Sequence, residues 1–220
     1  MNFFLKATFL LALIWCSFNA SAQFEGKINM SISVKAEDPD MAGMEAFMPT
    51  SMTYYVKQSK ARVETSTIMG NMIMLMDTVK REMITCMDMM GKKIAMVMSL
   101  DEMQNSEDAK KAKESMKIDY TKDTKVVAGY TCKKAKVSMD VEGSKIETDI
   151  WYTEEIQNFN TEYQEIKGFP LEFSMTAQGF TMSYSTTAIS KELVADNLFE
   201  VPEGYELTTQ EELQKKMGGQ

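Results

Sequence analysis

The sequence predicts a mainly β protein built on one large antiparallel sheet of about ten strands, which must curl or close on itself. Three observations lead to this fold class. Apolar and polar residues alternate through many short stretches, as in strands that are buried on one face only. Glycine-containing turn signals separate these stretches at short intervals. The segments with a helical pattern are few and short.

The first strand shows the pattern most clearly. From Phe24 to Lys35, apolar residues occupy one parity and polar residues the other, so one face is expected to be buried. Turn signals such as Met69-Gly70-Asn71 and Met90-Gly91-Lys92 then punctuate similar stretches along the chain. The further expected strands contain Met52-Tyr54-Val56, 62–68, 72–76, 83–87, 94–98, 126–139, 146–152, 171–175 and 180–184. A change of buried parity at Lys133-Lys134 predicts a bulge there.

Three segments between the strands are expected to be helical. Residues 40–48 form a short methionine-rich candidate that ends at Pro49. Residues 100–116 place their acids first and their lysines last, which suits the helix dipole. Residues 153–166 open on Thr153, a residue type that caps helices. These two or three short helices leave the fold class mainly β.

The chain begins with a segment that resembles a secretory signal peptide. Residues 1–22 combine an early Lys6, a short apolar run and the small-residue pattern Ala20-Ser21-Ala22, so cleavage is expected between Ala22 and Gln23. No later stretch reaches the roughly 20 apolar residues of a membrane span, so the mature chain is expected to lack a transmembrane segment. We expect an exported protein, in the periplasm or outside the cell, with a single domain over residues 23–207 and a weakly helical tail over residues 208–220.

Composition excludes several classes of function. The chain contains no histidine, which removes the commonest general base and metal ligand. Its 32 acidic residues against 24 basic ones disfavour a nucleic-acid partner. Nucleophile elbows, phosphate-binding glycine loops and Ser-x-x-Lys motifs do not occur. We therefore expect a protein that is not an enzyme, with no catalytic residues, no cofactor and no nucleic-acid partner.

Two cysteines, Cys86 and Cys132, remain after signal cleavage. Both lie in expected strands, and an even count in an oxidising compartment allows a disulfide between them. The alternative is a pair of buried free thiols that pack as small hydrophobic side chains. The sequence leaves both possibilities open.

Methionine is the most unusual feature, at 22 of 220 residues. The mature chain has seven leucines against 21 methionines, so part of the excess is methionine in place of leucine in an ordinary core. A second interpretation is a pliable apolar cavity, because unbranched thioether side chains adapt to different ligands. A third is a Cu(I) site, since soft sulfur ligands select that ion. Because Met72, Met74 and Met76 share one strand face, a sheet lining is favoured over a copper site.

Several motifs resemble those of a known family. Residues 127–153 read VAGYTCKKAKVSMDVEGSKIETDIWYT, residues 168–171 read GFPL, and residues 189–207 read ISKELVADNLFEVPEGYEL. Together with the tyrosine- and lysine-containing stretch over residues 54–64, this order resembles the secreted proteins of the domain-of-unknown-function 4412 family. That family is similar to periplasmic lipoprotein carriers of the LolA/LolB type. The resemblance implies an unclosed antiparallel half-barrel with short helices in its mouth, and it assigns no activity.

The leading functional hypothesis is a lipid or another apolar ligand held in the concave face of this half-barrel, under a lid of short helices. The residues expected near the ligand are Tyr54, Val56, Met72, Met74, Met76, Met96 and Met98 from the sheet, and Met44, Phe47 and Met48 from the lid. This hypothesis includes no metal ion. The alternatives are a Cu(I)-binding protein that uses Met41, Met44, Met48 and Cys86, and a structural or partner-binding module whose barrel is filled and has no ligand.

Overall fold

The computed structural model describes residues 23–209, except 69, 90, 142, 143, 162 and 178, together with residue 212. The expected signal peptide, residues 1–22, and its cleavage site lie outside the described residues, as does most of the tail beyond residue 209. Within the described part of the chain, no helix is both long and apolar enough to cross a membrane.

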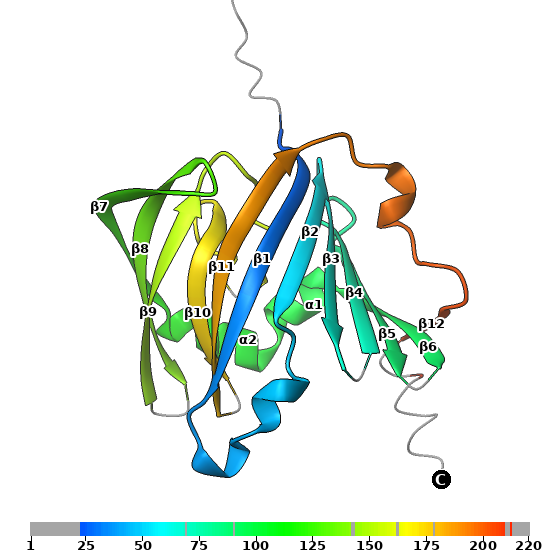
Figure 1. Ribbon diagram of the computed structural model, residues 1–220, viewed down its shortest axis with the longest axis horizontal. Helices are drawn as coiled ribbons and strands as arrows, with labels where there is room; N and C mark the ends of the chain where they lie inside the picture. The colour runs from blue at the N-terminus through cyan, green and yellow to red at the C-terminus, as the bar shows by residue number, and fades with distance from the viewer. Residues whose placement is uncertain are drawn as a thin grey trace, which may run out of the picture.

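Twelve strands form one curved sheet that does not close (Figure 1), which confirms the predicted fold class. The strands are β1 (Glu25–Ala36), β2 (Ser51–Lys57), β3 (Lys60–Thr67), β4 (Gly70–Asp77), β5 (Glu82–Met89), β6 (Lys92–Ser99), β7 (Lys117–Val127), β8 (Tyr130–Val141), β9 (Ser144–Thr153), β10 (Phe169–Ala177), β11 (Phe180–Lys191) and β12 (Glu206–Thr209).

The sheet consists of two antiparallel meanders that meet at β1 and β11. Its order is β12-β6-β5-β4-β3-β2-β1-β11-β10-β9-β8-β7, so β12 and β7 are the free edges. All neighbours are antiparallel except β12, which runs parallel to β6. The first meander is therefore joined to the second by the long antiparallel pairing of β1 with β11, from Gly26↔Lys191 to Ala36↔Phe180.

The connection between the two meanders crosses the concave side as two helices, α1 (Leu100–Asn105) and α2 (Glu107–Ser115) (Figure 1). The Ser99 and Ser106 hydroxyls accept hydrogen bonds from the first-turn N–H groups of Glu102 and Ala109, so each serine caps one helix. The helix expected over residues 100–116 is thus present, but it is divided in two at Ser106, which ends one helix and caps the next.

The expected helix over residues 40–48 is instead a pair of short 3₁₀ helices, η1 (Pro39–Met41) and η2 (Met44–Phe47). Gly43 lies between them with φ of +89°, a left-handed conformation that interrupts a continuous helix. A third 3₁₀ helix, η3 (Asp196–Phe199), follows the last long strand.

The helix expected over residues 153–166 is wrong, because residues 154–168 form an irregular loop between β9 and β10. Two asparagines determine this outcome. The Asn158 side-chain amide donates to the carbonyls of Tyr163 and Ile166, at 2.8 and 3.2 Å, and its Oδ1 accepts from the N–H of Asn160. The Oδ1 of Asn160 accepts from the N–H of Tyr163. Asparagine side chains compete with helical backbone hydrogen bonds in this way.

The strand expected over residues 126–139 is two strands, since β7 ends at Val127 and β8 begins at Tyr130. Ala128 and Gly129 have φ of +48° and +87°, which is the left-handed pair that a tight two-residue hairpin requires. The expected bulge lies in β7 and not at Lys133-Lys134. Tyr120 pairs with Ala135 and Thr124 with Lys133, so the additional residues belong to β7, opposite Lys134.

The C-terminal segment covers part of the convex face. Val201 and Tyr205 pack on a small buried cluster formed by Leu75, Cys86 and Ala95. The buried Arg62 guanidinium donates to the carbonyl of Leu198 at 2.9 Å and pairs with Glu64 at 2.6 Å. The chain then continues as β12 to Thr209, two residues beyond the expected end of the domain.

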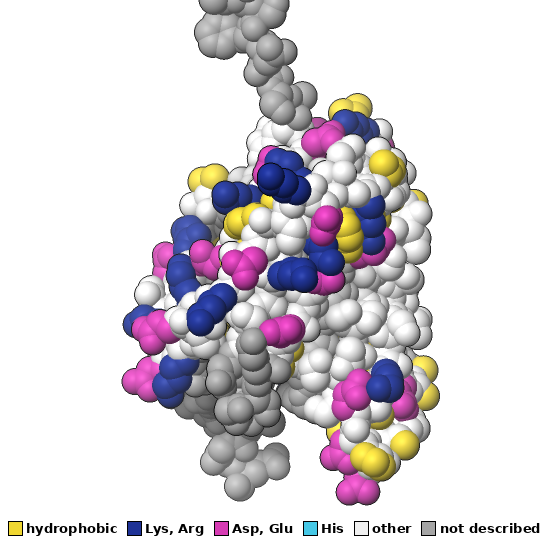
Figure 2. All heavy atoms as spheres, turned by 90° about the vertical axis from the view of Figure 1, so that its left-hand side faces the viewer, with side chains coloured by type: hydrophobic (Ala, Val, Ile, Leu, Met, Phe, Trp, Pro, Cys, Tyr) yellow, Lys and Arg dark blue, Asp and Glu magenta, His cyan; other side chains and the backbone are white. Residues whose placement is uncertain are grey.

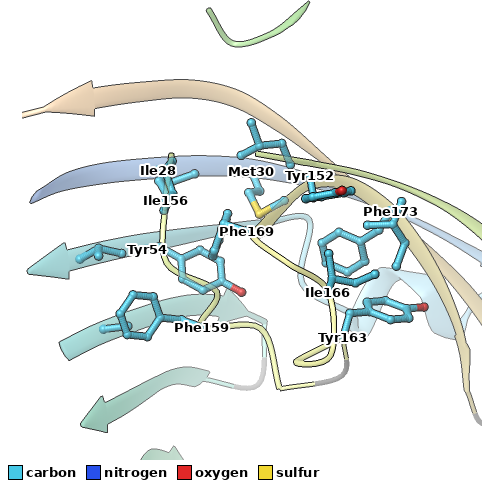
Figure 3. Packing of buried hydrophobic residues seen from close by; sticks show 14 of the residues in the cluster. Ile28, Met30, Tyr54, Tyr152, Ile156, Phe159, Tyr163, Ile166, Phe169 and Phe173 are labelled. Carbon is cyan, nitrogen blue, oxygen red and sulfur yellow. The ribbon is translucent and has the colours of Figure 1, made fainter. Parts of the chain in front are cut away.

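The main core lies on the concave side, between the sheet and the loop over residues 154–168 (Figure 3). Ile156, Phe159, Tyr163 and Ile166 are all buried, with exposed fractions of 1–3%. They pack against concave-face residues of the sheet that include Ile28, Met30 and Tyr54. Hence this loop fills the middle of the concave side.

The Asn158 hydrogen bonds predict a measurable stability cost. The substitution Asn158→Ala removes three hydrogen bonds from a loop whose apolar side chains form the core, so we expect unfolding free energy to fall by about 2–3 kcal/mol. Urea denaturation followed by circular dichroism measures this change. Asn197→Ala, at an exposed position in η3, is the control and should change stability by less than about 0.5 kcal/mol. Equal effects of both substitutions would contradict the loop's proposed role.

Candidate functional site

Seven methionines from three neighbouring strands share the concave face of the sheet. Their cross-strand pairs are Met72 with Met87, Met76 with Met83, and Met83 with Met98. Directly paired residues of antiparallel strands project from the same face. Met74 and Met96 join them because both pair with Thr85. We call this set the methionine face: Met72, Met74, Met76, Met83, Met87, Met96 and Met98.

Exposure changes across the methionine face. Met76 and Met83 are buried, with exposed fractions of 7% and 3%, and they belong to the main core. Met72 is 38% exposed. Met74, Met87, Met96 and Met98 are half-buried. The face therefore runs from the core, near the α1 end of β6, to solvent, near the opposite end of β4.

Two residues expected at the ligand site lie too deep to contact a ligand. Tyr54 and Val56 share the concave face, through the pairs Tyr54↔Val63 and Val56↔Ala61, but their exposed fractions are 5% and 1%. The Tyr54 ring packs edge-on against Phe169, with ring centroids 5.0 Å apart. Burial raises the pKa of the Tyr54 hydroxyl. Both side chains are therefore part of the packing beneath the loop over residues 154–168.

The segment expected to be a lid, residues 40–48, does not extend across the concave side. It lies beyond the ends of β1 and β2 (Figure 1), where Met44 and Phe47 are 45% and 46% exposed and Met48 is half-buried. The Glu45 carboxylate holds this segment to β1, since it accepts from the N–H groups of Ala36 and Gly43 at 3.3 and 2.7 Å. The hydrogen bond from its own N–H, followed by those from Ala36 and Gly43, lowers the pKa of the Glu45 carboxyl.

Three cavities of the structure lie away from the methionine face. One of about 610 Å³ is lined by Gln23, Gln157 and the turns that follow β2 and β4. One of about 510 Å³ lies along β7, β8 and β9 and reaches Ser174. The third, of about 230 Å³, lies between the α1–α2 pair and the loop over residues 154–168. A ligand of the methionine face would therefore lie along partly exposed side chains and not in these cavities.

The two cysteines are free and buried, so the disulfide considered from the sequence is not formed. Cys86 lies in β5 and Cys132 in β8, and seven strands separate β5 from β8 in the sheet. Neighbouring strands are about 4.8 Å apart, whereas a disulfide requires Cα atoms within about 7 Å. Spacing in the sequence could not reveal this separation, because it depends on the order of the strands.

The copper interpretation is not supported by the arrangement of its expected ligands. Cys86 packs with Leu75 and Ala95 on the convex side of the sheet and is 0% exposed, whereas Met41, Met44 and Met48 lie beyond the ends of β1 and β2. Within the described residues, no group of three or more cysteine or acidic side chains could hold a metal ion. Burial also raises the pKa of both thiols, that of Cys132 to about 11, which disfavours the thiolate that metals bind.

Met52, Met83 and Met87 also lie on the concave face and were absent from the expected site. Met52 pairs with Thr65, which in turn pairs with Met72, so Met52 extends the row of Met72 and Met87 toward β1. The alternation within residues 83–87 placed Met83 and Met87 on one strand face. Sequence periodicity does not show whether that face is concave or convex, because this depends on the register of β5 with β4.

Comparisons with known proteins agree with the fold. The family model of the domain of unknown function DUF4412 matches residues 24–164. No curated protein matches the chain. Two crystal forms of PNGF-II are similar to 87% of the chain, with 13% and 12% identity and TM-scores of 0.51 and 0.52. The matched part is 32% of PNGF-II, so the chain spans about a third of that protein, and the likeness shows the fold alone.

Two mycobacterial proteins, of which the first is the lipoprotein LppX, also match. LppX of Mycobacterium tuberculosis is 9% identical with a TM-score of 0.42, over 78% of this chain and 90% of LppX. LprF of Mycobacterium bovis is 7% identical with a TM-score of 0.34, over 77% of this chain and 88% of LprF.

The burial of both cysteines predicts unreactive thiols. With a pKa of about 11, only about one Cys132 thiol in a thousand is ionised at pH 8, and the raised pKa of Cys86 acts in the same direction. We expect a thiol reagent at pH 8 to label neither cysteine in the native protein and both after denaturation without reductant. An intact mass 2 Da lower, with no thiol released by denaturant alone, would show a disulfide and contradict the structure.

Proposed function

The chain belongs to the DUF4412 family, and from that premise we propose that it is an exported, non-enzymatic protein that binds a lipid or another apolar molecule along the methionine face. The observation that carries the proposal is the set of half-buried methionines on β4, β5 and β6. Their side chains share one face of a curved sheet and keep part of their surface in contact with solvent. Because this surface of thioether side chains is only partly covered, a ligand that buries the rest of it would gain free energy.

The chemistry of methionine fits a chain-like apolar ligand. Its side chain is unbranched and polarisable, so a row of methionines can adjust to ligands of different shape. Burying one such side chain completely is worth about 2 kcal/mol. A ligand that covers the exposed parts of Met72, Met74, Met87 and Met96 would therefore gain several such partial contributions. The direction from buried Met83 to exposed Met72 offers a path for an extended acyl chain.

The charged groups support a binding role and not a catalytic one. The acidic residues lie mainly on the surface, in ion pairs such as Lys57 with Asp196 at 2.9 Å and Lys133 with Glu154 at 2.8 Å. These partners explain why the pKa of Asp196 is lowered and that of Lys133 is raised. The buried thiols are held in their protonated, weakly nucleophilic form. These features favour a surface that binds without reacting.

The proposal predicts that polar substitutions on the methionine face weaken ligand binding. Met72→Gln and Met87→Gln replace apolar surface on two paired strands, and we expect each to lower the affinity for a fluorescent fatty acid by about tenfold. In ¹³C-methyl methionine NMR spectra, the ligand should shift the resonances of Met72, Met74, Met87 and Met96.

The matched control is Ile73→Gln. Ile73 neighbours both Met72 and Met74 on β4 but is half-buried on the convex side, with Leu75 and Cys86. Its substitution should leave affinity unchanged. No uptake of fatty acid by the wild-type protein, or shifts confined to methionines outside the methionine face, would rule out the proposal.

A further inference from the structure

Oxidisable sulfur is exposed to solvent at methionine rather than at cysteine. Cys86 and Cys132 are both 0% exposed, and burial raises the pKa of each thiol, so little reactive thiolate forms. Methionine reacts as the neutral thioether and needs only to be exposed. Met72 is 38% exposed, and its cross-strand partner Met87 is half-buried. A small oxidant that arrives from solvent therefore meets these methionines before it meets either cysteine.

The methionine face presents its side chains to solvent in a definite order. Met72 is its most exposed member, and Met74 and Met87, its neighbours on β4 and β5, are half-buried. Met76 and Met83 are only 7% and 3% exposed. Because the susceptibility of methionine to oxidation follows its exposure, the reaction should begin at Met72, continue at its half-buried neighbours and reach the core last.

A second exposed methionine lies away from the methionine face. Met44 is 45% exposed in η2, beyond the ends of β1 and β2. Figure 2 shows apolar and acidic side chains together at the lower tip of the molecule, where Figure 1 places η1 and η2. Met44 is therefore open to the same oxidant as Met72 but does not belong to the methionine face. The pair separates the effect of position from the effect of the chemistry.

Oxidation reverses the property of the thioether on which binding of an apolar ligand depends. In the overall reaction with hypochlorous acid, the sulfur gains the oxygen atom and loses two electrons, while the chlorine takes up those electrons and leaves as chloride with a proton. The sulfoxide that forms is polar, and its oxygen accepts hydrogen bonds. An acyl chain laid over it would leave that oxygen without a partner, which opposes binding.

We propose that the methionine face is a site of reversible oxidation, at which sulfoxide formation at Met72, followed by Met87, prevents an apolar ligand from binding. The effect on the ligand rests on the proposed function, whereas the order of oxidation does not. A bound ligand would cover Met72, so the oxidant reacts with the empty protein and keeps it empty. Methionine sulfoxide reductases reverse the step, since two thiols supply two electrons, become a disulfide and release the oxygen as water.

The first experiment follows the oxidation of each methionine in the mature protein without ligand. After limiting hypochlorous acid, tandem mass spectrometry of peptides should show Met72 oxidised at least about tenfold faster than Met83, with Met87 between them. A mixture of methionine sulfoxide reductases with dithiothreitol should return Met72 to the thioether. Equal rates at Met72 and Met83 in the folded protein, or a sulfoxide at Met72 that the reductases do not remove, would overturn the inference.

The second experiment compares the affinity for a fluorescent fatty acid before and after the dose that converts Met72. We expect a loss of about tenfold that the reductases restore. Met72→Leu has no sulfur at this position, so its own affinity should change by less than about twofold on oxidation. The matched control, Met44→Leu, makes the same substitution away from the methionine face and should lose affinity as the wild-type protein does. Bound fatty acid should slow the oxidation of Met72 but not that of Met44.

The outcomes distinguish this inference from the proposed function. Unchanged affinity after oxidation, in a reduced protein that binds, would overturn the inference and leave the proposed function intact. An equal loss in Met72→Leu, or a loss that accompanies unfolding seen by circular dichroism, would also overturn it. If the reduced protein binds no fatty acid, the proposed function fails, whereas selective oxidation and repair at Met72 would still support the modification site.

Discussion

The structure depends on covering the concave face of a sheet that does not close. An apolar sheet face must pack against another layer, and the free edges at β7 and β12 prevent the sheet from closing around its own interior. The loop over residues 154–168 supplies most of that layer, with buried side chains that include Phe159 and Tyr163. The loop forms neither a helix nor a strand, and the Asn158 side chain holds its path by donating to the carbonyls of Tyr163 and Ile166. The core of the sheet therefore depends on a few polar hydrogen bonds in an irregular segment.

The convex face is covered in a different way, and this difference explains why Cys86 is buried whereas several methionines are partly exposed. Over β3 to β6, the C-terminal segment packs on Leu75 and Cys86, and Arg62 fastens it through the carbonyl of Leu198. The same strands direct their methionines to the concave side, where coverage by the loop and the helices becomes incomplete toward Met72. The C-terminal segment thus covers the convex side chains of these strands, whereas their concave side chains remain partly exposed. The proposed ligand surface lies where this coverage ends, as expected if a ligand buries apolar surface that the fold leaves exposed.

Much of the sheet was predictable because alternation is a local signal. The strand around Ile28 and Met30, the turns at Gly70 and Gly91, and the shared face of Met72, Met74 and Met76 all follow from residues close together in the chain. The helix expected over residues 153–166 is wrong for a related reason. Its buried residues, among them Ile156, Phe159 and Tyr163, have nearly helical spacing, but local periodicity does not show that asparagine side chains take the backbone hydrogen bonds.

The sequence by itself determined the class of fold, the lack of histidine chemistry and the presence of methionine-rich strand faces. Tertiary structure alone decided which of those faces is open. Tyr54 and Val56 carry the same alternation signal as Met72 and Met74, yet the loop covers the first pair and leaves the second partly exposed. It also decided that seven strands lie between the strand of Cys86 and the strand of Cys132. Each of these results depends on contacts between residues far apart in the chain, and local patterns of hydrophobicity do not predict such contacts.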